Sequence, residues 1–144
     1  MSTLKVANIK HETSGINTLV FDNGGTSGGK GRVTTKGTIG AIHPQGTNLS
    51  GDITLDFGDG NNFSMTLTGV SELKNPTTMA AGQSGVLFIT QGAGGSHLLS
   101  FDTYWEFSDG TAPTLSTTAG AVDMVAYIVR SSTKISAQFV GNFS

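Results

Sequence analysis

The stretch DITLDFGDGNNFSMTLT, residues 52–68, decides the fold class of this chain. Its apolar and polar side chains alternate on both sides of a glycine-rich centre, Gly58-Asp59-Gly60-Asn61. Period-two alternation gives a β-strand one apolar and one polar face, and glycine supplies the positive φ angles of a tight turn. We therefore predict a β-hairpin here, with its apolar face toward a core.

Alternation and glycine-rich turns continue toward the C-terminus. They predict a second hairpin, a further short strand, a loop and a closing hairpin. In chain order these elements are a strand at 86–90, a turn at 92–95, a strand at 98–101, a strand at 104–107, a loop at 108–121, a strand at 122–130, a turn at 131–133 and a strand at 134–140.

The first forty residues are less regular. Residues 16–21 and 33–42 are candidate strands on either side of a glycine-rich loop at 23–31, and residues 1–13 are a candidate N-terminal docking arm. No window carries the apolar stripe of an amphipathic helix. We predict one all-β domain over residues 1–144, an antiparallel β-sandwich or jelly-roll-like fold built from hairpins.

Charged residues are scarce in this chain. They make up 12% of its 144 residues, and the formal net charge is −2. This argues against nucleic-acid binding, which needs clustered Lys and Arg, and against disorder. The apolar runs are too short to span a membrane. Because a weakly charged surface solubilises a free monomer poorly, we expect copies of the chain or a partner to cover part of it.

Motifs for cofactors and metals are incomplete. Residues 24–31 have P-loop spacing, but Gly31 stands where a Ser or Thr would hold Mg²⁺. The four turn residues Asp56, Asp59, Asn61 and Asn62 do not have EF-hand spacing. His11, His43 and His97 are far apart, and the chain has no cysteine. We therefore predict no cofactor, no metal and no catalytic residue.

An aromatic segment holds the candidate contact residues. Glu106 lies between Trp105 and Phe107 and near two aspartates, Asp102 and Asp109. Glycosidases use paired carboxylates, but strand alternation explains the same pattern without catalysis. Tyr104 and Trp105 remain candidate contacts for a glycan or receptor, since aromatic rings offer apolar platforms.

Several segments resemble small tail-fibre-type and virion structural proteins of tailed phages, especially those of aquatic bacteria. The resemblance covers Met1 to Ile9 and much of the chain after Asp52, and the run Gly110-Thr111-Ala112-Pro113-Thr114-Leu115 is its most specific part. The other segments that carry it are 81–91, 99–101, Trp105, 116–123 and 129–135.

The resemblance implies a non-enzymatic β module displayed on the virion surface, often as a homotrimer. Its partners would be itself, other virion proteins and a host-surface glycan or receptor. No secretion signal is evident, so we expect synthesis in the host cytoplasm. The short chain carries no shaft, which leaves open capsid decoration as an alternative and a glycan-active enzyme based on Glu106 as a remote one.

Overall fold

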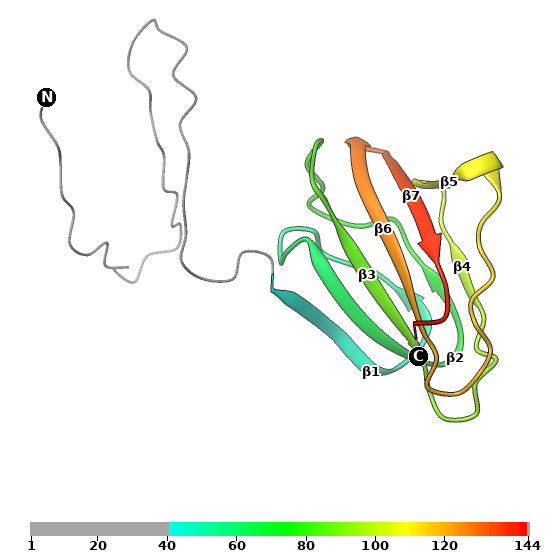
Figure 1. The fold of residues 1–144 in the computed structure, drawn as a ribbon. Coiled ribbons are helices and arrows are strands. Elements are labelled where there is room, and N and C mark those ends of the chain that lie inside the picture. The colour runs from blue at the N-terminus through cyan, green and yellow to red at the C-terminus, as the bar shows by residue number, and fades with distance from the viewer. Residues whose placement is uncertain (1–40, 144) are drawn as a thin grey trace, which may run out of the picture. The chain divides into compact units, whose positions relative to one another are not determined.

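The computed structural model describes residues 41–143, which form seven β-strands (Figure 1). Within this range there is no α-helix, only a short 3₁₀ turn at Ser108–Gly110, and no helix long and apolar enough to cross a membrane. The strands are β1 Ile42–Ile53, β2 Asn62–Leu73, β3 Ser84–Gln91, β4 Leu99–Phe101, β5 Trp105–Phe107, β6 Val122–Ser131 and β7 Lys134–Val140.

The seven strands form one mixed sheet. Its order is β1-β2-β3-β6-β7-β5, and β4 pairs with β2. The pairs β1–β2, β2–β3, β2–β4 and β5–β7 are parallel, whereas β3–β6 and β6–β7 are antiparallel. The all-β prediction is confirmed, but this partly parallel sheet is not the clear antiparallel sandwich that the turns suggested.

The predicted hairpin at 52–68 is wrong in its pairing. Ile53 pairs in parallel with Leu73, and the backbone N–H of Phe57 donates to the carbonyl of Thr77. The two arms of the predicted hairpin meet through side chains instead, since the Phe57 and Phe63 rings stack with centroids 5.6 Å apart. Alternation correctly identified the buried faces, but it carries no information about which strand lies alongside.

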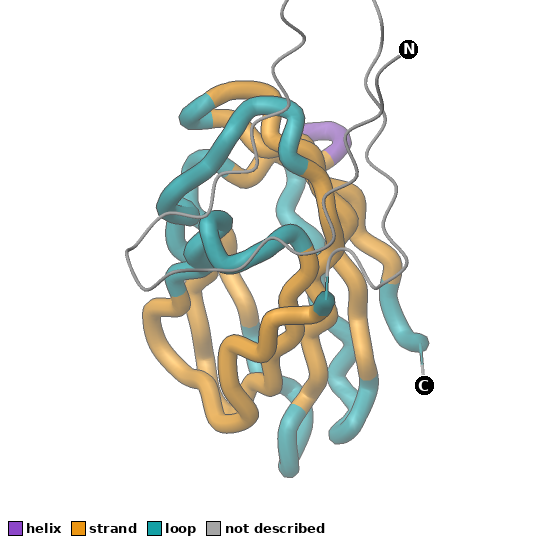
Figure 2. Tube along the Cα trace, turned by 90° about the vertical axis from the view of Figure 1, so that its left-hand side faces the viewer, coloured by secondary structure: helices purple, strands orange, loops and turns teal. Residues whose placement is uncertain are grey.

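The second predicted hairpin is also wrong. Residues 63–67 of β2 pair with 87–91 of β3, and 71–73 of β2 pair with 99–101 of β4. β3 and β4 thus pair with different halves of β2 and do not pair with each other. Loops join the strands of the described chain (Figure 2), and residues 92–98 form the loop that connects β3 to β4.

β2 changes its pairing partner from β3 to β4 at residues 68–70, between its two halves. A Cβ at Gly69 would lie 2.9 Å from the Cβ of Ser50, so glycine permits β1 and β2 to approach closely there. Val70, in the same stretch, is 70% exposed. The strands β1, β3 and β4 all run parallel to β2.

The C-terminal predictions are confirmed. β6 and β7 form an antiparallel hairpin whose turn lies at residues 132–133, and β5 covers Trp105–Phe107 of the predicted strand at 104–107. Residues 108–121 are a loop apart from the 3₁₀ turn. The predicted arm at 1–13, the strand at 16–21, the glycine-rich loop and most of the strand at 33–42 lie outside the described residues.

An aromatic cluster forms the centre of the core. The Tyr127 ring stacks on Phe57 at 4.9 Å and meets Trp105 edge-on at 5.9 Å. The Tyr127 hydroxyl donates to the carbonyl of Asn61 over 2.5 Å. Gly85 makes room for this contact, because a Cβ there would lie 1.7 Å from that carbonyl oxygen.

Three polar side chains hold loops onto this core. Gln83 donates to the carbonyls of Phe57 and Gly60, and Gln91 exchanges two hydrogen bonds with the backbone of His97. Asp123, fully buried, accepts from Ser116 and from the backbone N–H of Asn142. Buried polar groups with satisfied hydrogen bonds favour a single arrangement of the segments that they join.

Candidate functional site

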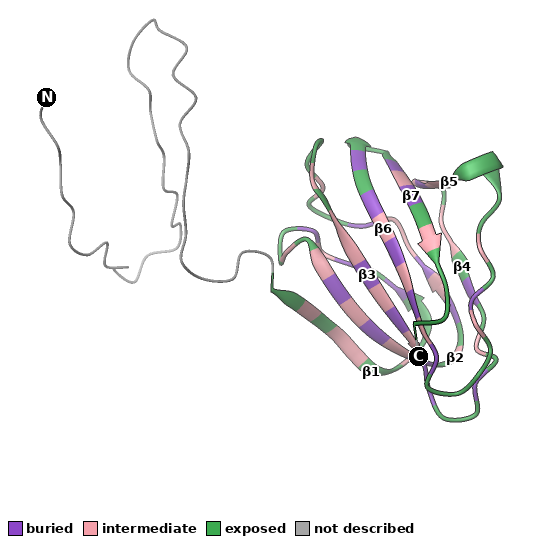
Figure 3. Ribbon diagram, viewed as in Figure 1, coloured by how far each residue is buried: buried purple, intermediate pink, exposed green. Residues whose placement is uncertain are grey.

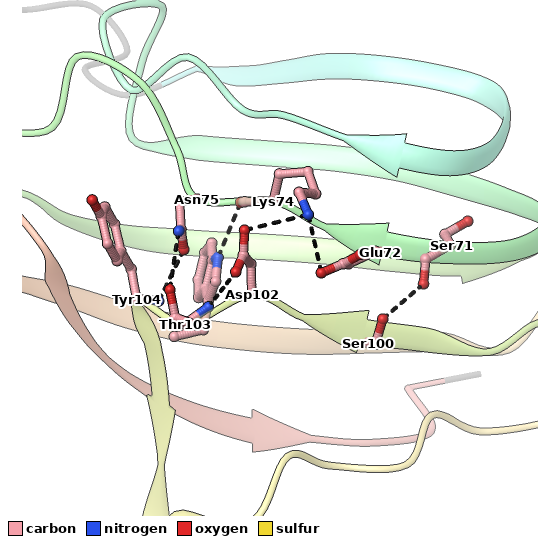
Figure 4. A network of polar contacts seen from close by, with 9 residues as sticks. Ser71, Glu72, Lys74, Asn75, Ser100, Asp102, Thr103 and Tyr104 are labelled. Atoms are coloured by element: carbon pink, nitrogen blue, oxygen red, sulfur yellow. Dashed lines mark hydrogen bonds and ion pairs between the residues drawn. The ribbon is translucent and has the colours of Figure 1, made fainter.

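A polar network holds the turn between β4 and β5 against the end of β2 (Figure 4). The Lys74 ammonium lies 3.2 Å from Glu72 Oε1 and 3.5 Å from Asp102 Oδ2. Glu72 and Lys74 come from the end of β2, and Asp102 follows β4 directly. Parallel pairing of β2 with β4 brings these residues together although thirty positions separate the two carboxylates.

Asn75 completes the attachment of the turn. The side-chain NH₂ group of Asn75 donates to the Thr103 hydroxyl over 3.2 Å, and the side-chain oxygen Oδ1 accepts from the Tyr104 backbone N–H over 2.9 Å. The Trp105 indole N–H donates to the carbonyl of Lys74 over 3.3 Å. Because the turn is bonded through both side chain and backbone, its residues keep a defined orientation at the surface.

A hollow of about 420 Å³ lies beside this network. Its aromatic lining comes from Phe101, Trp105 and Phe107, and the Phe101 and Phe107 rings meet edge-to-face at 4.7 Å. All of its ionisable lining groups are acidic, and the rest of the lining is small or hydroxylic. The full lining is Glu72, Phe101, Asp102, Thr103, Trp105, Glu106, Phe107, Gly110 and Ala112.

The carboxylates at this hollow are suited to accept hydrogen bonds. The backbone N–H of Thr103, 2.7 Å from Asp102 Oδ1, lowers the pKa of Asp102, and Lys74 lowers it further. The hydrogen bond to Glu72 in turn raises the pKa of Lys74. Asp102 is therefore ionised at neutral pH and accepts hydrogen bonds there, whereas a general acid needs a raised carboxyl pKa.

Glu106 is held from both sides by cations. Arg130 contacts one of its carboxylate oxygens and Lys134 contacts the other. Glu106 and Phe107 also line a second, larger hollow over β6 and β7. The sequence analysis grouped Glu106 with Asp102 and Asp109. Asp102 and Glu106 both line the smaller hollow, whereas Asp109 is not among its lining residues.

The two predicted contact residues are placed differently. Trp105 is 6% exposed, and its indole packs among Phe57, Phe101 and Tyr127 in the core, although the residue is part of the lining of the hollow. Tyr104 is half-buried and packs against the same core. A direct glycan contact by this pair stays a prediction. Sequence reasoning missed that Glu72 and Phe101 line the hollow, because it lacked the β2–β4 pairing.

Three other candidate residues make contacts with neighbouring groups in the described part of the chain. Asp56 accepts from the backbone N–H of Gly58 over 2.8 Å, and this bond lowers the pKa of Asp56. The ring of His97 lies 3.3 Å from the carbonyl of Ala93, and His43 lies 3.8 Å from Asp59. Between residues 41 and 143, no three His, Cys, Asp or Glu residues are grouped to hold a metal. The P-loop-like segment at 24–31 and His11 lie outside the described residues.

Three comparisons with known proteins found no relative of this chain. No protein-family model, no curated protein and no solved structure matches this chain.

Proposed function

We propose that this chain is a non-enzymatic structural protein of a tailed-phage virion, a surface-displayed β module of the tail-fibre or adhesin kind. The resemblance of its C-terminal half motivates the proposal. The observation that carries the receptor-binding part is the hollow between Phe101 and Phe107, with Glu72 and Asp102 fixed at its rim. Rigidly supported surface sites of this type are where binding modules contact ligands.

The lining of the hollow favours a neutral or amino sugar as ligand. Aromatic side chains cover the apolar C–H faces of a sugar ring, and carboxylates accept hydrogen bonds from its hydroxyls. The lining carboxylates Glu72, Asp102 and Glu106 are already ion-paired, so they offer acceptors to sugar hydroxyls, and a sugar carboxylate would bring only further acceptors to them. The adhesin would therefore bind host glycans without carboxylates.

Binding to host cells and to purified glycans tests this function. The labelled protein is expected to bind cells saturably, and neutral glycans are expected to compete better than acidic ones. Asp102→Asn should weaken binding about tenfold, since it replaces a charged acceptor at the rim. Asp52→Asn, an exposed aspartate of β1 outside the lining, serves as the matched control. Wild-type protein that fails to bind at saturating concentration contradicts the adhesin role.

Capsid decoration is the second candidate function. The low charge of the chain and the exposed apolar side chains Ile42, Val70 and Leu98 favour a protein that binds other surfaces. Saturating protein should then raise the melting temperature of undecorated capsids. Gold-labelled antibody against the chain on intact virions separates the two roles, with label on heads for decoration and on tails for an adhesin.

The remote alternative is a glycan-active enzyme that depends on Glu106. Both carboxylate oxygens of Glu106 are engaged by Arg130 and Lys134, which favours a structural ion pair over a free catalytic group. Hydrolysis of host glycans by wild-type protein, abolished in Glu106→Gln, would support the enzyme instead.

A further inference from the structure

The larger hollow, over β6 and β7, lies on the outward face of the sheet. Figure 3 shows buried residues alternating with more exposed ones along β6, because successive side chains of a strand face opposite sides. The strand register places part-exposed Ser136 opposite Ile128 of β6 and Glu106 of β5. In the next row, Ala126 is opposite Gln138. Small side chains at Ala126 and Ser136 leave room there, and the hollow that these five residues help to line has a volume of about 620 Å³.

Hydrogen-bond donors surround the larger hollow. The hydroxyls of Ser108 and Ser136 and the side-chain amide of Gln138 belong to its lining. Arg130 also lines it and keeps donors beyond its contact with Glu106, because a guanidinium has five N–H groups. Small-molecule sites combine apolar surface with a few polar groups that fix the orientation of the ligand. The lining therefore fits a ligand that carries several hydroxyl groups.

The two hollows meet at β5. Glu106 and Phe107 line both of them. β5 is the last strand in the order of the sheet and pairs with β7, whereas the smaller hollow is lined by no residue of β6 or β7. The larger hollow thus lies on the β7 side of β5, and the smaller one lies on the side of the β4–β5 turn. A ligand longer than one hollow can occupy both if it crosses β5.

Glu106 is fixed at this crossing and still accepts hydrogen bonds. Arg130 contacts one carboxylate oxygen and Lys134 contacts the other. Two oxygens offer about four lone-pair sites, so acceptor capacity remains for a hydroxyl of a ligand. Because the carboxylate is already ion-paired, a neutral ligand that covers it does not leave an isolated charge without a partner.

We propose that the two hollows are neighbouring subsites for one ligand, a neutral oligosaccharide that crosses β5 over Glu106. The smaller hollow supplies carboxylate acceptors to one sugar unit, and the larger hollow supplies donors to the next units. Each hollow alone has the size of a small-molecule site, so a single sugar ring occupies only one of them. This inference rests on the proposed glycan-binding function and extends it from one sugar unit to a chain.

The dependence of affinity on saccharide length tests this inference. The probes are neutral homo-oligomers of glucose, galactose, mannose and N-acetylglucosamine, each from one to six units long, titrated calorimetrically into the full chain. A series that binds should gain at least about tenfold in affinity between the single unit and the longer saccharides, since the added units make further hydrogen bonds in the larger hollow.

Variants in the larger hollow separate its contribution. Ser136→Leu fills the hollow and should reduce the affinity for longer saccharides to that for a single unit. Ser84→Leu is the matched control, because Ser84 is an exposed serine opposite Ile128 on the same face and lines neither hollow. Gln138→Ala removes an amide at an exposed position and should weaken binding of the longer saccharides about fivefold. It decides the question if circular dichroism shows that Ser136→Leu does not fold.

Three results would overturn the inference. One is a wild-type protein that binds a single unit as tightly as every longer saccharide of the series, which leaves the proposed adhesin standing. Another is a gain with length that persists in both Ser136→Leu and Gln138→Ala. The third is a wild-type protein that binds no saccharide of any length at saturating concentration, which counts against the proposed adhesin as well.

Discussion

The buried carboxylate of Asp123 should contribute a large part of the stability of this domain. Asp123 is fully buried and accepts three hydrogen bonds, from the Ser116 N–H at 2.8 Å, the Ser116 hydroxyl at 2.7 Å and the Asn142 N–H at 2.9 Å. Together these bonds attach the 108–121 loop and the C-terminal segment to β6. Asp123→Asn keeps the shape of the side chain but replaces Oδ2, the acceptor for the Ser116 N–H, with an NH₂ group.

The expected loss of unfolding free energy follows from these three hydrogen bonds. Asp123→Asn loses one charge-assisted hydrogen bond and sets two donors against each other, which should cost about 2 kcal/mol of unfolding free energy. If the side chain of the Asp123→Asn variant rotates by half a turn, its NH₂ group instead faces the Ser116 hydroxyl and the Asn142 N–H, so the conflict between donors remains. Asp123→Ala loses all three bonds and should cost about 3–5 kcal/mol, a large part of the 5–15 kcal/mol typical of a domain.

Urea unfolding followed by tryptophan fluorescence measures this cost. Trp105 is the only tryptophan of the chain and is buried in the core, so its emission reports on folding of the described domain. The control is Asp52→Asn, which changes an exposed aspartate and should leave stability within about 0.5 kcal/mol. An Asp123→Asn variant as stable as this control would refute the reasoning.

Three further predictions concern the core and the β4–β5 turn. Gly85→Ala should unfold the domain or cost more than about 3 kcal/mol of unfolding free energy, because its Cβ would lie 1.7 Å from the Asn61 carbonyl oxygen. The control is Gly60→Ala, whose Cβ meets nothing within 4 Å and should be tolerated, and thermal melts of both variants check this. Burial raises the pKa of Tyr127 above its ordinary value of 10.0, so the unfolded chain loses this proton first and stability should fall as pH rises past 10. Tyr127→Phe should lose less stability than wild type between pH 9 and pH 11, as measured by urea midpoints, and equal losses would contradict this. The pKa of Asp102 is lowered from 3.8, so its contribution to folding stability is present at neutral pH and is lost as pH falls below that value. Asp102→Asn should therefore reduce the loss of stability on the acid side of a plot of stability against pH, and an unchanged acid slope would count against this prediction.

The candidate site was only partly visible in the sequence. Asp102, Trp105 and Glu106 are neighbours in the chain, so their proximity followed directly from the order of residues. Glu72 and Lys74 reach the same place only because β2 pairs in parallel with β4. The sequence contains no spacing signal for such a contact, since the register of parallel strands depends on the whole connection between them.

The sequence by itself determined the secondary-structure class, the buried faces of the strands and the closing hairpin of β6 and β7. These are local properties, because side-chain alternation and turn residues act over a few positions. Only the tertiary structure decided the partners of β1 to β5. Phe57 and Phe63 lie on either side of residues 58–62 and stack through their rings, while their backbones bond to other segments. That choice depends on burying the aromatic core around Tyr127, which involves residues from three separate parts of the chain.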